Sequence, residues 1–211
     1  MRIRIALIVL AALLALPLAP TAAPVAAKNR SRTVTKTFRN TAPISLLIAP
    51  GSPVSAALYP SPIAVSGLKG TVRDVNVRLD RLSHDDTDEV HVLLVGPGGQ
   101  TAIVMADAGG APAIGVTLGL DDEADAPLAK GALHPGTFLP TNINDAAIAF
   151  NAPAPTASAN AALSVFDGTD PNGTWRLFVQ DDNGPKDSGA FAGGWELEIT
   201  AKAKAKNRKK R

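Results

Sequence analysis

Residues 170–200 read DPNGTWRLFVQDDNGPKDSGAFAGGWELEIT, and this stretch decides the fold. It holds both tryptophans of the 211-residue chain, together with five glycines and four aspartates. Apolar side chains alternate along it in two rows: Trp175, Leu177, Val179 and then Trp195, Leu197, Ile199. Alternation with period two places such side chains on one face of a β-strand. The stretch therefore predicts two strands whose tryptophans enter a sandwich core, with glycine turns that bring the second strand alongside.

Similar short alternations recur through the rest of the chain, separated by glycine and proline. Residues 89–99 are expected to form a strand that runs into a Gly-Pro-Gly-Gly turn, with residues 100–107 as its hairpin partner. The longest loop is expected at residues 128–162, and no long stretch has helical periodicity. We predict an all-β fold, an antiparallel, jelly-roll-like β-sandwich of eight or nine strands. The other predicted strands lie within residues 38–48, 71–82, 115–125, 162–168, 174–182 and 193–200.

The first 27 residues have the pattern of a secretory signal peptide, with Arg2 and Arg4 before a 12-residue apolar core and a cleavage position after Ala27. The apolar core is shorter than the roughly 20 residues that span a bilayer. We therefore expect a secreted, extracellular protein that lacks both cysteine-based lipid anchors and disulfides, because the chain has no cysteine. Residues 28–40 are expected to form a basic arm and the start of the first strand, residues 33–200 the sandwich, and residues 201–211 a disordered basic tail.

The net charge of +2 conceals a strong segregation of charge along the chain. Between residues 41 and 200, seven basic residues face all 19 acidic residues, so the body carries about −12, whereas the arm adds +5 and the tail +7. The tail predicts binding to a polyanion such as an anionic envelope polymer near the cell surface, and a merely solubilising end is the alternative. Nucleic acid is not expected as a partner behind a signal peptide, and no aromatic residue lies among the basic residues of the tail. The candidate polyanion-binding residues are Lys202, Lys204, Lys206, Arg208, Lys209, Lys210 and Arg211.

Three clusters of acidic residues follow predicted strands, and they raise the question of metal binding. Residues 85–89, residues 121–125 and residues 181–183 with Asp187 supply the carboxylate and amide oxygens that Ca²⁺ prefers. Asp and Asn are also favoured in ordinary turns, so both interpretations stay open. The spacing is not that of an EF-hand loop. The calcium ligands that we favour are Asp85, Asp86, Asp88, Asp121 and Asp122.

Catalysis is not expected. A subtilisin-like enzyme needs an Asp, a His and a Ser in separate structural contexts together with an oxyanion donor. Of the three histidines, His84, His91 and His134, none begins a helix of the required kind, and the body is too short for a separate catalytic domain. For His84, at the end of a predicted strand, we expect a structural hydrogen bond.

Two blocks of this sequence resemble the P domain, or P/Homo B domain, which follows the catalytic domain in proprotein convertases and some bacterial subtilisin-like proteases. The first block comprises Phe166-Asp167-Gly168, the segment from Asn172 to Asp181, Asp187-Ser188-Gly189 and the segment from Gly194 to Ile199. The second has His84, a strand at residues 90–95 and the Gly-Pro-Gly-Gly turn, with Glu89, Val90 and Gly96 departing from the family pattern. The resemblance covers residues 33–200 and implies a β-sandwich associated with serine proteases.

Two functions remain open at this point. The chain could be a non-catalytic extracellular module that binds an unknown protein or an anionic envelope polymer. Alternatively, it could be an accessory or stabilising partner of a separate subtilisin-like serine protease, which the resemblance alone suggests.

Overall fold

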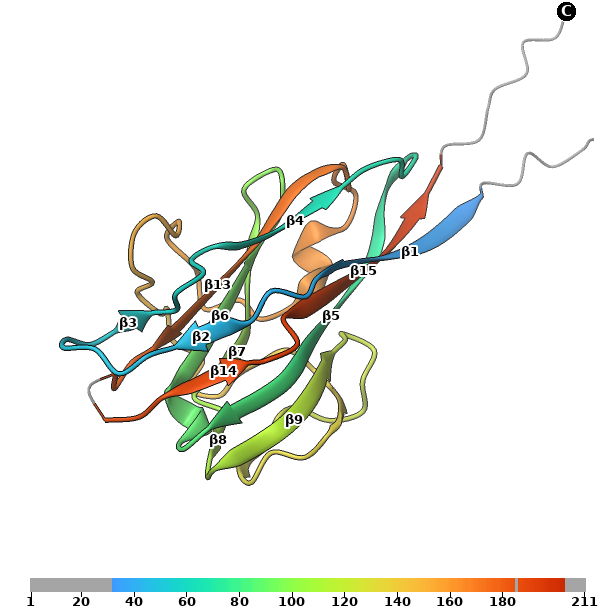
Figure 1. The fold of residues 1–211 in the computed structure, drawn as a ribbon. Coiled ribbons are helices and arrows are strands. Elements are labelled where there is room, and N and C mark those ends of the chain that lie inside the picture. Colours follow the sequence, from blue (N-terminus) through green and yellow to red (C-terminus); the bar gives the residue numbers. More distant parts are fainter. Residues whose placement is uncertain (1–31, 185, 204–211) are drawn as a thin grey trace, which may run out of the picture.

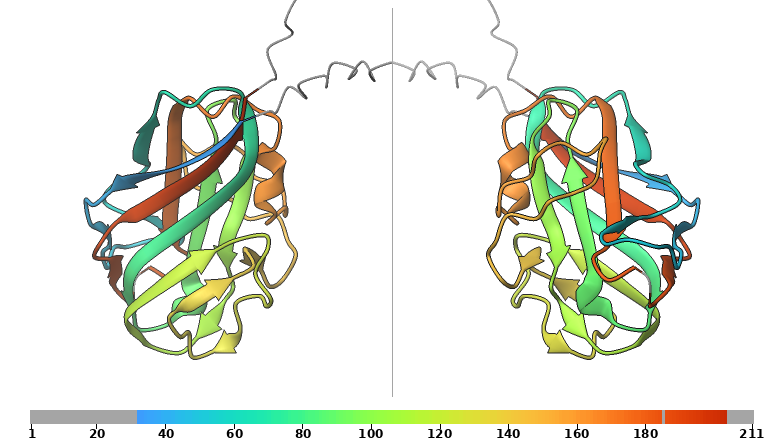
Figure 2. Two further views of the ribbon diagram at one scale, coloured as in Figure 1. Left: turned by 90° about the vertical axis from the view of Figure 1, so that its right-hand side faces the viewer. Right: turned by 90° about the vertical axis from the view of Figure 1, so that its left-hand side faces the viewer.

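Two β-sheets packed face to face make up the computed structural model, which describes residues 32–184 and 186–203 (Figures 1 and 2). In the first sheet, the long strand β5 (Thr71–His84) pairs with β15 (Trp195–Lys202) and β14 (Gly189–Phe191) on one side and with β9 (Ala113–Leu120) on the other. The sheet is completed at its edges by β1 (Thr33–Asn40), β2 (Ile44–Leu46) and β11 (Gly136–Phe138).

The second sheet is built around β13 (Gly173–Asp181) and the hairpin of β6 (Val90–Val95) and β7 (Thr101–Ala106). Its edges are β3 (Val54–Ser55), β4 (Ser61–Val65) and β12 (Thr141–Asn142). The strands β8 (Gly109–Gly110) and β10 (Lys130–Gly131) form a small separate pair, and the 3₁₀ turns are η1 (Thr87–Glu89) and η2 (Leu163–Phe166). The prediction of an all-β sandwich is confirmed.

The two tryptophans lie in the core between the sheets, as their alternating pattern predicts. Both are fully buried, and so are the apolar residues that follow each of them at alternate positions. The indole N–H of Trp175 donates to the carbonyl of Pro171 at 2.9 Å, and that of Trp195 donates to the buried hydroxyl of Ser61 at 3.0 Å. A buried indole N–H needs such a partner. The opening stretch of sequence is therefore architectural.

Three short strand pairs are parallel, whereas we predicted an antiparallel sandwich. They join β11 to β9, β12 to β7 and β10 to β8. Each involves a strand of two or three residues from the expected loop at residues 128–162, which runs along the edges of the sheets. The same segment also covers the outer face of the second sheet, where Ile148 and Phe150 pack in a second apolar cluster with Leu93 and Phe178.

The prediction of a strand at residues 162–168 is wrong, because the chain forms the 3₁₀ turn η2 there. The carboxylate of Asp122 accepts the backbone N–H of Leu163 at 2.9 Å and that of Ser164 at 2.7 Å, so these groups need no neighbouring strand. Leu163 and Phe166 are both buried, as their spacing of three residues permits in a 3₁₀ turn.

The boundary of the predicted tail also needs correction. Ala201 and Lys202 belong to β15, since that strand stays paired with Thr33 of β1 on one side and with Thr71 of β5 on the other. Ala201 is buried and continues the inward row of β15. The first strand begins at Thr33, the predicted start of the sandwich, but it ends at Asn40, whereas the predicted strand lay within residues 38–48. The expected signal peptide and residues 204–211 lie outside the described residues. Within the described residues, no helix is long and apolar enough to cross a membrane.

Replacing Trp195 with Ala should destabilise the protein by about 3–5 kcal/mol, because it leaves a large cavity and removes one of the two hydrogen bonds to Ser61. Urea unfolding followed by circular dichroism measures this loss. The control is Ile114→Ala, whose side chain is 90% exposed and should change stability by no more than about 0.5 kcal/mol. Equal effects of the two substitutions would contradict the assignment of Trp195 to the core.

Candidate divalent-cation site

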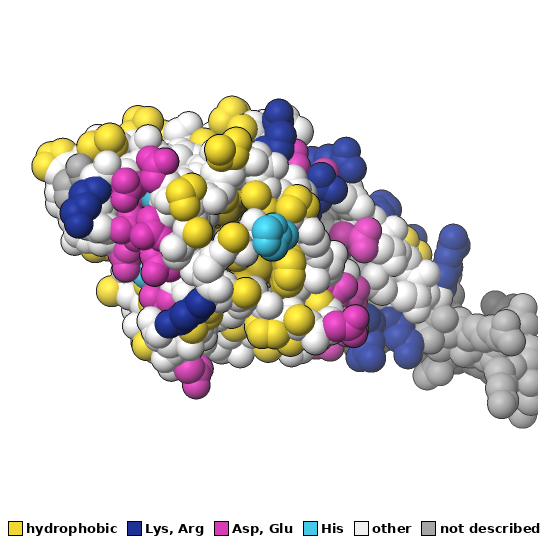
Figure 3. All heavy atoms as spheres, turned by 90° about the horizontal axis from the view of Figure 1, so that it is seen from below, with side chains coloured by type: hydrophobic (Ala, Val, Ile, Leu, Met, Phe, Trp, Pro, Cys, Tyr) yellow, Lys and Arg dark blue, Asp and Glu magenta, His cyan; other side chains and the backbone are white. Residues whose placement is uncertain are grey.

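Acidic side chains from three separate segments meet at one end of the sandwich. The segments are residues 85–89 between β5 and β6, Asp107 directly after β7, and the turn at residues 181–183 after β13. They meet because β6 pairs with both β7 and β13, with Val90 opposite Asp181. Figure 3 shows a dense patch of acidic side chains at one end of the molecule, with a Lys or Arg side chain beside it. We call this region the acidic end.

One group of side chains at the acidic end is fully hydrogen-bonded. The Nε2 of His84 lies 3.0 Å from a carboxylate oxygen of the buried Asp181, and Nδ1 of His84 accepts the backbone N–H of Asp86 at 3.2 Å. Because Nδ1 accepts, Nε2 carries the proton and donates it to Asp181. The other oxygen of Asp181 accepts the backbone N–H of Asn183 at 2.8 Å. The structural hydrogen bond expected for His84 is confirmed.

The backbone of this end is also held in place by the neighbouring loop. The N–H of Asp182 donates to the carbonyl of Glu89 at 3.0 Å, and the side-chain amide of Asn183 donates to the Glu89 carboxylate. The turn after β13 and the loop before β6 therefore form one hydrogen-bonded unit. Burial raises the pKa of Glu89, while the hydrogen bond from Asn183 acts in the opposite direction.

A second group consists of His91, Asp107 and Asp182, and its side chains are not hydrogen-bonded to one another. The Nε2 of His91 lies 3.7 Å from Oδ1 of Asp107 and 3.7 Å from Oδ2 of Asp182. The histidine is buried, Asp107 is partly buried and Asp182 is exposed. Potential ligand atoms of the three residues all lie within 4.8 Å of one another. This group, which we call the His91 cluster, has the composition of a metal site.

Two of the aspartates predicted as ligands, Asp86 and Asp88, lie beside the His91 cluster. Burial first, and then the hydrogen bond and the charge of Asp86, raise the pKa of Asp88. The charges of Asp182 and Asp107 raise it further. Burial likewise raises the pKa of Asp182, and the charge of Asp107 adds to this effect while His91 opposes it. Burial and the neighbouring negative charges thus both oppose ionisation of Asp88 and Asp182.

The other predicted ligands do not join this group. Asp85 is exposed and lines an open groove with Ser83 and Ile114. Asp121 and Asp122 follow β9, whose last residue Leu120 pairs with Val77, halfway along β5. Both oxygens of Asp122 accept backbone N–H groups, and Oδ1 of Asp121 accepts the N–H of Glu123 at 2.8 Å. The two predicted sets of ligands are thus far apart, and the second has a structural role in its turn.

Sequence reasoning did not select His91 or Asp107, and it left Asp182 outside the favoured ligands. The three residues are brought together by pairing between strands that are distant in sequence. One signal was available: His91 is the only non-aliphatic residue in the strand VHVLLV, whose side chains are all buried.

Of the predicted polyanion-binding residues, Lys202 is described and lies at the opposite end of the molecule. It is exposed at the last position of β15, beside Thr71 and close to Gly70. Arg32, Lys36 and Lys69 lie near the same loop, and Nζ of Lys36 donates to the carbonyl of Gly67 at 3.4 Å. We call this region the basic end. The remaining predicted residues, from Lys204 onwards, lie outside the described residues.

Comparisons with known proteins give little additional information. No protein-family model matches the chain, and no curated protein is significantly similar to it. Among solved structures, the chain is similar to the serine protease of Aeromonas sobria, both in its own crystal structure and in that of its complex with the chaperone. In each case the TM-score is 0.38 at 13% identity, over 81% of this chain and 27% of the other. The chain spans about a quarter of those proteins, and a likeness at this level carries no argument about family or activity.

Asp74 provides a test of the electrostatics near Asp121. Burial, followed by the charges of Asp121, Glu198 and Asp167, raises the pKa of Asp74. The folded chain thus holds this proton more tightly than the unfolded chain, whose Asp pKa is about 3.9. The stabilising contribution of Asp74 is complete below that unfolded value and is lost as the pH rises through the folded pKa.

We therefore expect Asp74→Asn to raise the melting temperature at pH 7, by up to about 3 °C, and to change it little at about pH 3. Asp170→Asn is the control of opposite sign, since hydrogen bonds from Asn172 lower the pKa of Asp170. That substitution should leave the melting temperature at pH 7 unchanged or lower it. A lower melting temperature for Asp74→Asn at pH 7 would show that its charge is stabilising.

Proposed function

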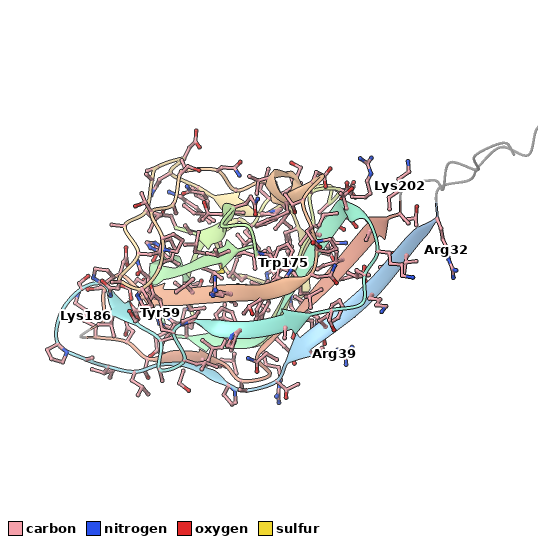
Figure 4. The ribbon with its side chains drawn as sticks, turned by 90° about the horizontal axis from the view of Figure 1, so that it is seen from above. Arg32, Arg39, Tyr59, Trp175, Lys186 and Lys202 are labelled. Atoms are coloured by element: carbon pink, nitrogen blue, oxygen red, sulfur yellow. The ribbon has the colours of Figure 1, made fainter. Side chains whose placement is uncertain are left out.

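We propose that this chain is a secreted, non-catalytic β-sandwich module that binds or supports a partner near the cell surface. The observation that carries this proposal is that the cluster of carboxylates and the chain termini lie at opposite ends of the domain. Arg32, the first described residue, and Lys202, next to the last one, lie at the basic end, and Lys186, which follows the turn at residues 181–183, lies at the other (Figure 4). The segments that continue beyond these residues carry further basic residues in the sequence.

The two ends are far enough apart to act independently. Strand β5 begins at Thr71, beside Lys202, and ends at His84, which bonds to Asp181. Fourteen residues of β-strand extend over roughly 40 Å, whereas charges are screened over about 8 Å at physiological ionic strength. A polyanion bound at the basic end would therefore not be repelled by the acidic end. Attachment through the termini would leave the acidic end directed outwards.

The environment of the histidines supports a non-catalytic role. A nucleophilic enzyme needs a histidine base that is hydrogen-bonded to its nucleophile. Here both ring nitrogens of His84 are engaged by Asp181 and the backbone of Asp86. His91 faces carboxylates rather than a hydroxyl group.

A second candidate function, an accessory partner of a separate serine protease, rests on the resemblance to P domains. The two similar blocks meet in the folded chain: His84 belongs to one and Asp181 to the other, and the two buried side chains are hydrogen-bonded. The protease itself would be a separate chain.

The basic tail is tested by replacing its six basic residues beyond the described strand with Gln, which keeps the length of the chain. Lys202 stays intact because it belongs to β15. Each basic residue near an anionic surface contributes about 1 kcal/mol of attraction. We therefore expect retention of the secreted protein in the envelope fraction to fall at least about tenfold. The residues replaced are Lys204, Lys206, Arg208, Lys209, Lys210 and Arg211.

Immunoblotting of envelope and medium fractions measures this distribution, and the control is Lys130→Gln, an exposed charge elsewhere on the domain. An unchanged distribution of the six-residue variant would overturn attachment through the tail.

The same variant, used as affinity bait, separates the two functions. Capture of a serine protease by both the variant and the original chain would favour the accessory role and place the protease contact on the sandwich.

A further inference from the structure

The His91 cluster contains a buried side chain that lacks hydrogen-bond partners. His91 is 3% exposed, and neither of its ring nitrogens bonds to another protein group. In the described residues, seven buried side-chain N and O atoms are without a partner, and five of them lie at the acidic end. Those five are one oxygen each of Asp86, Glu89 and Asp107 and both nitrogens of His91. Unsatisfied polar atoms thus concentrate where carboxylates also crowd together.

The separations within the cluster suit two ligands of one ion. An N–H···O hydrogen bond spans about 2.7–3.2 Å, so His91 at 3.7 Å is too far from either carboxylate to donate to it directly. A tetrahedral metal ion with ligands at about 2.0–2.1 Å holds neighbouring ligand atoms about 3.4 Å apart. The two separations from His91 are a few tenths of an ångström longer than this value, and all three ligand atoms lie within 4.8 Å of one another. Small side-chain rotations would close the difference.

We propose that His91, Asp107 and Asp182 bind a divalent transition-metal ion of the zinc class at the acidic end. An imidazole nitrogen is a good ligand for such ions, whereas Ca²⁺ takes oxygen ligands. The ion would therefore differ from the calcium expected for Asp86 and Asp88, whose carboxylates instead lie beside the site. Their negative charge adds to that of Asp107 and Asp182 and favours a cation at this end of the sandwich. Entry from solvent is open through Asp182, whose side chain is 45% exposed.

The ion would connect three elements that no covalent bond joins. His91 belongs to β6, Asp107 follows β7 and Asp182 lies in the turn after β13. A metal bound in this way acts as a cross-link in a chain without cysteine. The proposal goes beyond the module function above, which requires no metal. Failure of either one leaves the other standing.

Metal binding can be measured on the mature chain, from Lys28 to Arg211, after removal of metals with EDTA. We expect Zn²⁺ to bind in a 1:1 ratio by isothermal titration calorimetry. At a free concentration 100-fold above its dissociation constant, it should raise the melting temperature by about 5–10 °C. Co²⁺ should give visible absorption bands typical of a nitrogen- and oxygen-ligated ion.

Variants of the cluster then assign the ligands. His91→Ala should abolish 1:1 binding, and Asp182→Asn should weaken it at least tenfold. Asp182→Asn is the more secure variant, since its side chain is 45% exposed whereas that of His91 is buried in a strand, and the substitution keeps the size of the side chain. His134→Ala is the control for adventitious binding to an exposed histidine, and it should bind Zn²⁺ like the original chain.

Three results would overturn the proposal. The first is no Zn²⁺ binding at millimolar concentration. The second is binding that persists unchanged in a folded Asp182→Asn variant or that is lost in His134→Ala. The third is a melting temperature that responds to Ca²⁺ and not to Zn²⁺, which would point to an all-oxygen site at Asp86 and Asp88.

Discussion

The backbone pairing of β5 is the constraint on which the rest of the structure depends. This strand runs from the basic end to the acidic end and is paired along both sides. Its register shifts between Leu79 and Leu82, and Arg81 there has a left-handed φ of 59°. The irregularity falls where β5 changes partner on one side from β15 to β14. Two short strands can therefore occupy one side of a single long strand, and the turn between them is held by the backbone of Asp80 and Arg81.

Because the chain has no cysteine, this pairing and the core that it supports must account for the stability of the domain. The inward residues of β5 face those of β13 and β6 across the sandwich, and both tryptophans join the same apolar cluster. Packing of this kind stabilises the middle of the domain but not its ends, where loops carry charge. The ends are thus the places where other forces, from the solvent or from bound ions, decide the local structure.

Much of the fold could be predicted from the sequence, because alternation of apolar residues reports directly on a face of a sheet. The strands with clear alternation, such as β5, β13 and β15, lie within one or two residues of their predicted positions. The turn η2 was missed because its shape depends on a carboxylate 41 residues away. The outer apolar cluster was missed because the alanine-rich segment that forms it has no periodicity. Neither feature is local, so neither leaves a local pattern.

The same limit applies to the acidic clusters. In the sequence, residues 85–88 and residues 121–122 look alike, but their carboxylates are satisfied differently in the folded chain. Asp122 accepts two backbone N–H groups and needs no counter-ion. At the acidic end, Asp86 and Asp107 each keep a buried oxygen without a donor, beside an unpartnered His91. A carboxylate withdrawn from water requires either hydrogen-bond donors or a positive charge. The supply of backbone donors, which only the three-dimensional structure reveals, is what separates an aspartate that shapes a turn from one that is free to bind a cation.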